Sequence, residues 1–187
     1  KLRIADVYEN LKKTANGEIV SDNSKITFER YIMGSYFEKV LYYANLRFSK
    51  MTGGRYEIVR GESRDKRISA GLEISVRDNF NNKERDISSL SGGESFQASL
   101  ALALGLSDII QQRNGGIRLD SIFIDEGFGS LDNDSLASAI ETLNDLTGNG
   151  NRLVGIISHI SELKNSIGNK IEVVGTKSGS SIKIITD

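Results

Sequence analysis

Between residues 90 and 157, helical patterns alternate with short segments that are apolar throughout. An apolar helix is predicted for residues 94–112 and another helix for residues 134–146. The apolar segments 121–124 and 153–157 are too short for helices, and unbroken apolar runs are typical of strands buried in a parallel sheet. The sequence therefore predicts an α/β lobe whose parallel sheet is covered by helices on both faces.

Residue periodicity and turn residues predict further elements on either side of this region. In chain order they are a polar helix at 1–13, a loop at 14–25, a long helix at 26–51, strands at 56–59 and 72–76, a turn-rich stretch at 78–84, a short helix at 161–167, and strands at 171–174 and 182–185.

The residue types present exclude several kinds of protein. The 187 residues include no cysteine and one histidine, which excludes disulfide scaffolds, thiol nucleophiles and two-histidine metal centres. No apolar run approaches the ~20 residues of a membrane span. Residues 1–70 carry 14 Lys and Arg against 9 Asp and Glu, so this part either faces a polyanion or is simply a solvated surface. The sequence has no signal-like start, which favours a cytoplasmic location. It begins at Lys1 without a methionine, so we expect a piece of a longer protein.

Acidic residues follow one predicted buried strand, and the single histidine follows the next. Asp125 and Glu126 come directly after segment 121–124, and His159 closely follows segment 153–157. In a βαβ unit the carboxyl ends of both strands meet where ligands bind, so these residues should converge. Such paired carboxylates suit Mg²⁺ binding by the first and activation of water by the second. Alternatively, the acids cap a loop and the histidine is an ordinary surface residue.

The predicted helix at residues 94–112 starts at the end of a five-residue motif, Leu90-Ser91-Gly92-Gly93-Glu94. Two glycines at a helix start leave backbone N–H groups uncovered, and the helix dipole adds partial positive charge. The N-terminus of this helix can therefore bind a phosphate, to which the Ser91 hydroxyl would donate a hydrogen bond. A serine N-cap beside flexible glycines is the simpler alternative, but it does not account for the whole five-residue motif.

These segments, in this order, resemble ABC-type ATPases. Residues 90–94 resemble the signature motif, 122–126 the Walker B strand, 129–132 the D-loop, and His159 the switch histidine.

Longer stretches resemble the SbcC-type family, which is related to the SMC-type DNA repair ATPases. They are ITFERYIMGSYFEKVL and MTGGRYEI upstream, FIDEGFGSLD at 123–132 and VGIISHISEL at 154–163. The resemblance implies an α/β fold, the C-terminal lobe of an ATPase head with a parallel or mixed sheet and flanking helices, preceded by the base of a coiled coil.

One motif of that family is missing from this sequence. The Walker A loop, G-x-x-x-x-G-K-[ST], is absent, since the sequence contains no Gly-Lys pair. In SbcC-like proteins this loop lies in an N-terminal lobe. The resemblance therefore implies that residues 1–25 end a coiled-coil arm and its connecting loop, and that residues 26–187 form the C-terminal lobe. This chain alone is expected to lack ATPase activity.

The resemblance also implies how the site works with ATP and Mg²⁺. Two heads would enclose two ATP molecules, each gripped by one head and touched by the signature motif of the other. The motif residues that would bind the γ-phosphate in trans are Ser91, Gly92, Gly93 and Glu94. Asp132 of the D-loop would contact the opposite head.

The hydrolytic residues would come from the head that grips the nucleotide. Asp125 would position Mg²⁺, usually through water in such sites, while Glu126 and His159 would be catalytic. Glu126 would act on the attacking water, and His159 would hold the γ-phosphate.

Partners follow from the same resemblance. They are the N-terminal lobe with Walker A, a second copy of the head, an SbcD-type metallophosphoesterase nuclease and double-stranded DNA. No membrane partner is expected, and the expected location is near the nucleoid. A structural DNA tether of the SMC kind and the nucleotide-binding part of a transporter are the alternatives. The candidate DNA contacts are the basic residues of segment 1–13 with Arg30, Arg47, Lys50, Arg55 and Arg60. Alternatively, all of these residues are ordinary surface charges exposed to solvent.

Overall fold

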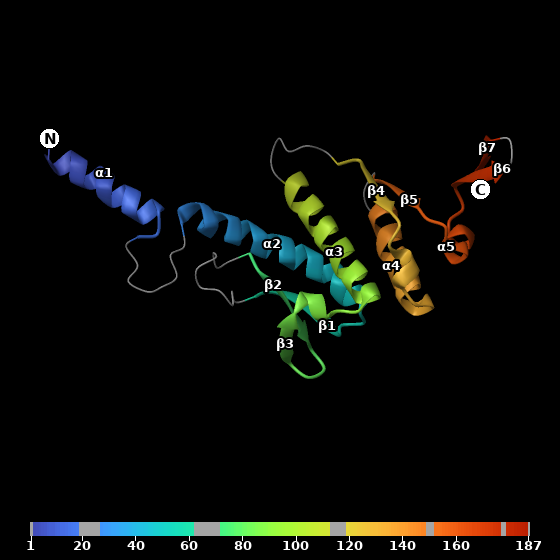
Figure 1. Cartoon of the computed structure of the whole chain (residues 1–187), viewed down its shortest axis with the longest axis horizontal. Coiled ribbons are helices and arrows are strands. Elements are labelled where there is room, and N and C mark those ends of the chain that lie inside the picture. Colours follow the sequence, from blue (N-terminus) through green and yellow to red (C-terminus); the bar gives the residue numbers. More distant parts are fainter. Residues whose placement is uncertain are drawn as a thin grey trace.

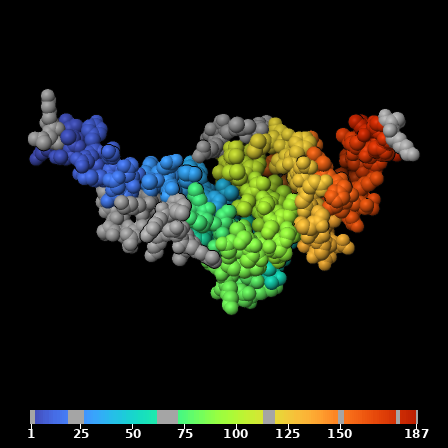
Figure 2. Space-filling view, viewed as in Figure 1, coloured from blue at the N-terminus to red at the C-terminus, as the bar shows by residue number. Residues whose placement is uncertain are grey.

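The computed structural model describes residues 2–18, 27–61, 72–112, 119–148, 152–176 and 179–186. The molecule is elongated, with helix α1 (Leu2–Ala15) at one end and the C-terminus at the other (Figures 1 and 2). Between the two ends, helices α2 (Phe28–Met51) and α3 (Gly92–Gln111) pack against each other. No helix in these described ranges is both long and apolar enough to cross a membrane.

Helix α1 confirms the predicted N-terminal helix and extends to Ala15, two residues into the segment predicted as a loop. The loop's residues 19–25 lie outside the described ranges. Four large apolar side chains of α1, spaced three and four residues apart, are exposed: Ile4, Val7, Tyr8 and Leu11.

Helix α2 confirms the long predicted helix. Thr27 caps its start, because the threonine side chain accepts a hydrogen bond from the Arg30 amide at 3.3 Å. The helix ends just before Gly53 and Gly54, whose positive φ angles of 58° and 78° turn the chain away from helical geometry.

A three-stranded antiparallel sheet follows, formed by β1 (Tyr56–Arg60), β2 (Ile74–Asp78) and β3 (Lys83–Asp86). Strands β1 and β2 confirm the predicted strands, although β2 begins and ends two residues later than predicted, so that Asp78 belongs to β2 and not to the predicted turn. The last two residues of that predicted turn are also wrong. They begin β3, whose sequence Lys-Glu-Arg-Asp offers no apolar alternation, so that its pairing with β2 is what reveals a strand. The 3₁₀ turn η1 (Ile87–Ser89) then leads into α3.

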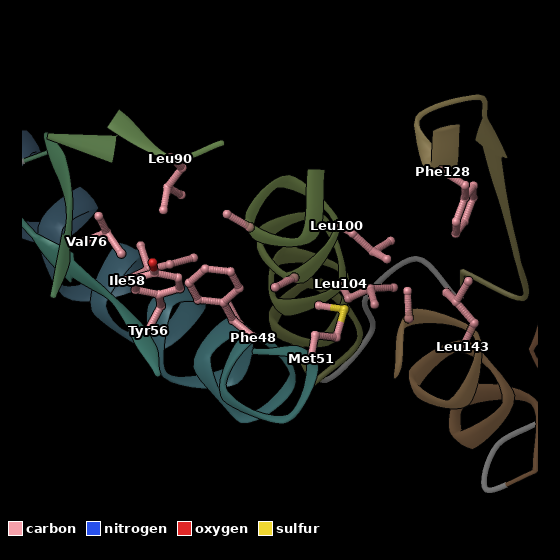
Figure 3. Packing of buried hydrophobic residues seen from close by; sticks show 14 of the residues in the cluster. Phe48, Met51, Tyr56, Ile58, Val76, Leu90, Leu100, Leu104, Phe128 and Leu143 are labelled. Carbon is pink, nitrogen blue, oxygen red and sulfur yellow. The ribbon is translucent and has the colours of Figure 1, made fainter. Parts of the chain in front are cut away.

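The main hydrophobic core lies between α2, α3 and this sheet (Figure 3). Phe48 of α2 and Ala101 of α3 are completely buried. The two helices approach so closely that a Cβ on Gly105 would lie 2.6 Å from the Val40 carbonyl oxygen. Helix α3 starts two residues earlier than predicted and otherwise confirms the prediction.

Strands β4 (Ser121–Asp125) and β5 (Leu153–Ile157) pair in parallel and are connected through helix α4 (Asn133–Gly148), which confirms the βαβ unit. The prediction that both faces of this sheet are covered is wrong. The side chains on the open face, Phe123, Leu153 and Ile157, are 69%, 65% and 56% exposed. An apolar run indicates that a strand is buried in the finished protein, but it does not say which segment covers it.

The last elements are helix α5 (Ser161–Ser166) and the hairpin β6 (Lys170–Thr176) and β7 (Gly179–Ile185), which confirm the predicted helix and strands. The hairpin register places four apolar residues in opposed pairs, and each is 67% to 71% exposed: Ile171 with Ile184, and Val173 with Ile182. The hairpin thus presents a second open apolar face.

Candidate functional site

Ser91 is the N-cap of α3 and forms a capping box with Glu94. Ser91 Oγ accepts a hydrogen bond from the Glu94 amide at 3.3 Å, and Glu94 Oε2 accepts one from the Ser91 amide at 2.9 Å. The structure therefore confirms the serine N-cap. Because the capping bond uses the hydroxyl oxygen as an acceptor, its proton remains able to donate to an anion at this helix end.

The structure explains in packing terms why glycines occupy positions 92 and 93, a reason that sequence reasoning missed. A Cβ on Gly93 would lie 2.8 Å from the Ser130 carbonyl oxygen, and one on Gly92 would lie 3.6 Å from Ser130 Cβ. The segment that resembles the D-loop therefore packs directly against the start of α3. Gly93 is needed for this close backbone approach, whatever else it binds.

Two residues that the sequence reasoning did not single out complete this end of α3. Arg85 Nη2 of β3 donates to the Tyr56 hydroxyl oxygen of β1 at 3.2 Å, and the positive charge of Arg85 is close enough to affect Glu94. Burial raises the pKa of Glu94, but the hydrogen bonds with Ser91 and the nearby charge of Arg85 outweigh it, so the pKa lies below its ordinary value. These residues are distant in sequence, so no local motif could have shown their contact.

Strand β4 ends at Asp125, and the chain then turns sharply. Glu126 has a φ of 58° and Gly127 a φ of 98°, so two consecutive residues adopt left-handed conformations. For Glu126 this costs about 1 kcal/mol or more, since only glycine adopts it freely. A hydrogen bond from the Glu126 amide to the Ile157 carbonyl oxygen, at 2.9 Å, holds the residue beside β5. Strain of this kind is typical of a functional position.

His159 lies beside Glu126, as the βαβ unit predicted. Its Nδ1 is 3.1 Å from Oε1 and 3.0 Å from Oε2 of Glu126. The two side chains are 81% and 50% exposed, so both are open to a ligand at the strand ends. The pair can share a proton between an imidazole and a carboxylate, and can orient a water molecule bound between them and a substrate.

Phe96 of α3 connects the two parts of the site. Its ring packs so tightly over Gly127 that a Cβ there would collide with it. The same ring meets Phe128 edge-to-face, with 4.8 Å between ring centroids. The helix that begins at Ser91 therefore touches the turn that carries Glu126.

Asp132 has a role within this chain. It precedes α4, and its carboxylate accepts a hydrogen bond from the Ser135 amide at 2.8 Å. This hydrogen bond lowers the pKa of Asp132, as expected for an acid that caps a helix. The predicted contact of Asp132 across a dimer remains a prediction.

Asp125 has the oxygen chemistry that Mg²⁺ prefers, and the residue is exposed at the end of β4. Within the described residues, no group of three or more acidic or histidine side chains could hold a metal ion by itself. Magnesium in nucleotide sites is commonly held by one or two carboxylates together with phosphates and water. The residues present fit that shared mode of binding.

Four of the candidate DNA contacts form ion pairs within the chain. These pairs are Arg47 with Asp108 at 2.7 Å, Lys50 with Asp145 at 2.8 Å, Arg55 with Asp78 at 3.4 Å and Arg60 with Glu38 at 2.8 Å. Arg47 is also largely buried, with 18% of its side chain exposed. These pairings show a structural role for the four cations and do not locate a DNA surface.

Comparison with known proteins agrees with this geometry. The family described as SbcC/RAD50-like, Walker B motif, matches residues 62–145. The SbcC subunit of nuclease SbcCD from Vibrio cholerae is 48% identical over 181 residues, which are 96% of this chain and 18% of that protein. The protein of the same name from Staphylococcus epidermidis is 56% identical over 153 residues, 82% of this chain and 15% of that protein. The chain thus spans less than a fifth of the length of these relatives.

A solved structure described as "Structural biochemistry of ATP-driven dimerization and DNA stimulated activation of SMC ATPases" superimposes with a TM-score of 0.66. The match is 15% identical and covers 84% of this chain and 89% of that one, so it shows the fold alone. Fold and site together define this chain as part of an ABC-type ATPase head with the SMC head fold. Within that class it belongs to the SbcC/RAD50-like family.

Proposed function

We propose that this chain is the C-terminal lobe of the ATP-binding and ATP-hydrolysing head of an SbcCD-type nuclease complex, which repairs DNA double-strand breaks. The observation that carries the proposal is Glu126, a strained carboxylate at a strand end beside His159. It lies on the same lobe as the Ser91 capping box, and Phe96 connects the two. Identities of 48% and 56% to the SbcC subunits of SbcCD nucleases favour this complex over an SMC-type DNA tether without a nuclease.

The open faces of the fold support a head made of two lobes. Phe123 and Leu153 on the β4–β5 sheet, with Ile171 and Ile184 on the hairpin, are apolar and mostly exposed. A second lobe that brings the missing Walker A loop would cover such faces and complete the sheet. Without that loop, we expect this chain alone to bind ATP weakly and not to hydrolyse it.

The N-terminal helix supports a coiled-coil arm. Its exposed apolar stripe, from Ile4 to Leu11, has the spacing of a helix that packs against another helix. We assign residues 1–25 to the end of this arm and its connecting loop, and residues 26–187 to the ATPase lobe.

In the assembled head, Glu126 would accept a proton from the attacking water, and His159 would orient that water and contact the γ-phosphate. Asp125 would hold Mg²⁺ jointly with the nucleotide. The ion would offset the negative charge of the phosphate oxygens. The hydrogen bond between the Glu126 amide and Ile157 keeps the carboxylate at the strand end, where these groups meet.

The start of α3 would serve the nucleotide of a second head. Ser91, Gly92 and Gly93 would bind its γ-phosphate through the hydroxyl and the uncovered amides, with Glu94 as the capping partner. Asp132 would contact the opposite head. The matched SMC structure is described as one of ATP-driven dimerization, and this supports the same arrangement here.

Closure of two heads on ATP would control an SbcD-type metallophosphoesterase nuclease bound to the same protein. The substrate would be double-stranded DNA ends and hairpins, in the cytoplasm near the nucleoid. DNA cleavage itself would belong to the partner.

The proposal is tested with Ser91→Arg in the full-length protein, measured by sedimentation with a non-hydrolysable ATP analogue. The long side chain would block the nucleotide of the opposite head, so we expect no ATP-dependent dimer. Ser99→Arg, on an exposed position of the same helix, is the matched control and should dimerise as the unmodified protein does. Dimerisation of Ser91→Arg at ordinary ATP concentrations would show that α3 does not bind the phosphate.

A further inference from the structure

We propose that Phe96 is a positioning residue for ATP hydrolysis: its ring holds the turn that carries the Glu126 carboxylate beside His159. This inference rests on the proposed function, in which Glu126 accepts a proton from the attacking water. Phe96 would touch neither the nucleotide nor that water, and would act on the reaction only through Glu126.

The turn after β4 has a backbone conformation that it would not keep by itself. Glu126 has a φ of 58°, which is costly for any residue with a side chain, and Gly127 follows with a φ of 98°. A costly conformation of this kind persists only where the surrounding structure enforces it. Neighbouring elements must therefore restrain this turn.

Strand β5 restrains the turn on one side. The Glu126 amide donates a hydrogen bond to the Ile157 carbonyl oxygen at 2.9 Å. This hydrogen bond fixes the peptide group that precedes Glu126, but it does not fix the peptide group that follows. A second restraint is needed between Glu126 and Gly127.

The Phe96 ring supplies that second restraint from α3. A Cβ on Gly127 would collide with Cδ2 and Cε2 of the ring and would lie 3.2 Å from its Cζ. The edge of the ring therefore lies directly against the Gly127 backbone. This contact limits rotation of the peptide group between Glu126 and Gly127 by steric exclusion.

The Phe96 ring is itself held in place. It meets the Phe128 ring edge-to-face, with 4.8 Å between the centroids and 62° between the planes. Phe128 is 1% exposed, and Figure 3 shows its ring directed from the turn into the core. Phe96 also packs against the core cluster from α3. A ring held on two sides can restrain a turn whose own side chains are exposed.

Loss of the ring should displace the Glu126 carboxylate. Without the ring edge, Glu126 can relax toward an ordinary φ, which moves its carboxylate away from His159 Nδ1, now 3.0 Å from Oε2. A displacement of about 1 Å can slow a reaction by as much as about 100-fold. The start of α3 keeps its own capping box, so binding of a phosphate there should not change.

The test uses Phe96→Leu in the full-length protein and measures single-turnover ATP hydrolysis and the ATP-analogue concentration for half-maximal head dimerisation. We expect hydrolysis to slow by about 10- to 100-fold, while the dimerisation concentration stays within about twofold. Phe37→Leu is the matched control, because Phe37 is another half-buried phenylalanine that packs against the same core cluster. It should leave the rate unchanged, and melting temperatures compare the loss of packing in the two variants.

A double variant separates positioning from general structural damage. Glu126→Gln already lacks the base, so adding Phe96→Leu should slow it further by less than about twofold. An unrelated structural defect would slow hydrolysis by the same factor in both backgrounds. Phe96→Met, which fills the space with a flexible chain instead of a rigid ring, should reproduce the slow hydrolysis.

Two results would overturn the inference. One is an unmodified rate in both Phe96→Leu and Phe96→Met, and the other is the same slowing factor with and without Glu126→Gln. Failure of the proposed function is distinguishable from these results. If Glu126→Gln hydrolyses ATP at the unmodified rate, Glu126 is not the base and the proposed site fails. If Glu126→Gln is slow and Phe96→Leu is not, only the role of Phe96 is wrong.

Discussion

The two halves of this chain differ in how completely they are covered. In the half formed by α2, α3 and the three-stranded sheet, which we call the closed half, Phe48 and Val76 are fully buried. In the half formed by β4, β5 and the β6–β7 hairpin, the open half, Phe123 and Ile184 are 69% and 71% exposed. Both halves contain strongly apolar segments. The difference is that the closed half brings its own covering elements, whereas the open half lacks a cover on one face.

This difference separates two kinds of residue. The open half carries Glu126 and His159 on an exposed edge, where a substrate can reach them. In the closed half, side chains such as Phe48 and Val76 are buried away from any substrate and form the core. Substitutions in this buried core should therefore change stability, whereas substitutions on the exposed edge of the open half should change chemistry or the binding of another lobe.

The largest expected effect is on chemistry in the open half. Glu126→Gln keeps the size of the side chain and the left-handed backbone strain but removes the base, so ATP hydrolysis in the assembled head should slow by about 100- to 10,000-fold. Single-turnover assays measure this rate. The melting temperature should stay unchanged, and Glu162→Gln, at an exposed position on α5, is the matched control. A near-normal single-turnover rate would remove Glu126 from its catalytic role.

The next largest effect is on stability in the closed half. Phe48→Ala removes a fully buried ring that packs against Tyr56, and it should lower the free energy of unfolding by about 3–5 kcal/mol. Tyr42→Ala, on the same helix but 62% exposed, should change it by less than about 0.5 kcal/mol. Denaturant unfolding of the two variants measures the difference. Equal effects would mean that the closed half is not the main core of the chain.

The sequence predicted the elements of both halves better than it predicted their surroundings. The βαβ unit and the meeting of Glu126 with His159 followed from strand ends alone, because parallel strands joined by one helix place those ends together. Strand β3 was missed because Lys83–Asp86 is wholly charged, and only its pairing with β2 defines it.

Long-range contacts were beyond the reach of sequence patterns. The hydrogen bond between Arg85 and Tyr56 joins β3 to β1, and the left-handed φ of Glu126 leaves no trace in residue type. The uncovered face of β4–β5 was predicted as covered for a related reason. An apolar residue such as Phe123 indicates that it is buried somewhere, and the covering segment can be distant or on another polypeptide.

Phe123→Ser is expected to have the smallest effect on this chain's own stability. This variant tests most directly whether the open half, unlike the closed half, is covered by another lobe. The ring is already exposed, so its loss should change the free energy of unfolding of the chain by less than about 0.5 kcal/mol. If another lobe covers this face, the same change should weaken lobe association by about 1.5–3 kcal/mol, or roughly 10- to 150-fold.

Calorimetry of a head assembled from separate lobes measures that association. Phe80→Ser is the matched control, because this phenylalanine is 77% exposed in the turn between β2 and β3. If Phe123→Ser and Phe80→Ser leave association equally unchanged, the open face is an ordinary surface and not a contact with a second lobe. A selective loss of association with Phe123→Ser would instead show that a second lobe covers the open face of β4 and β5.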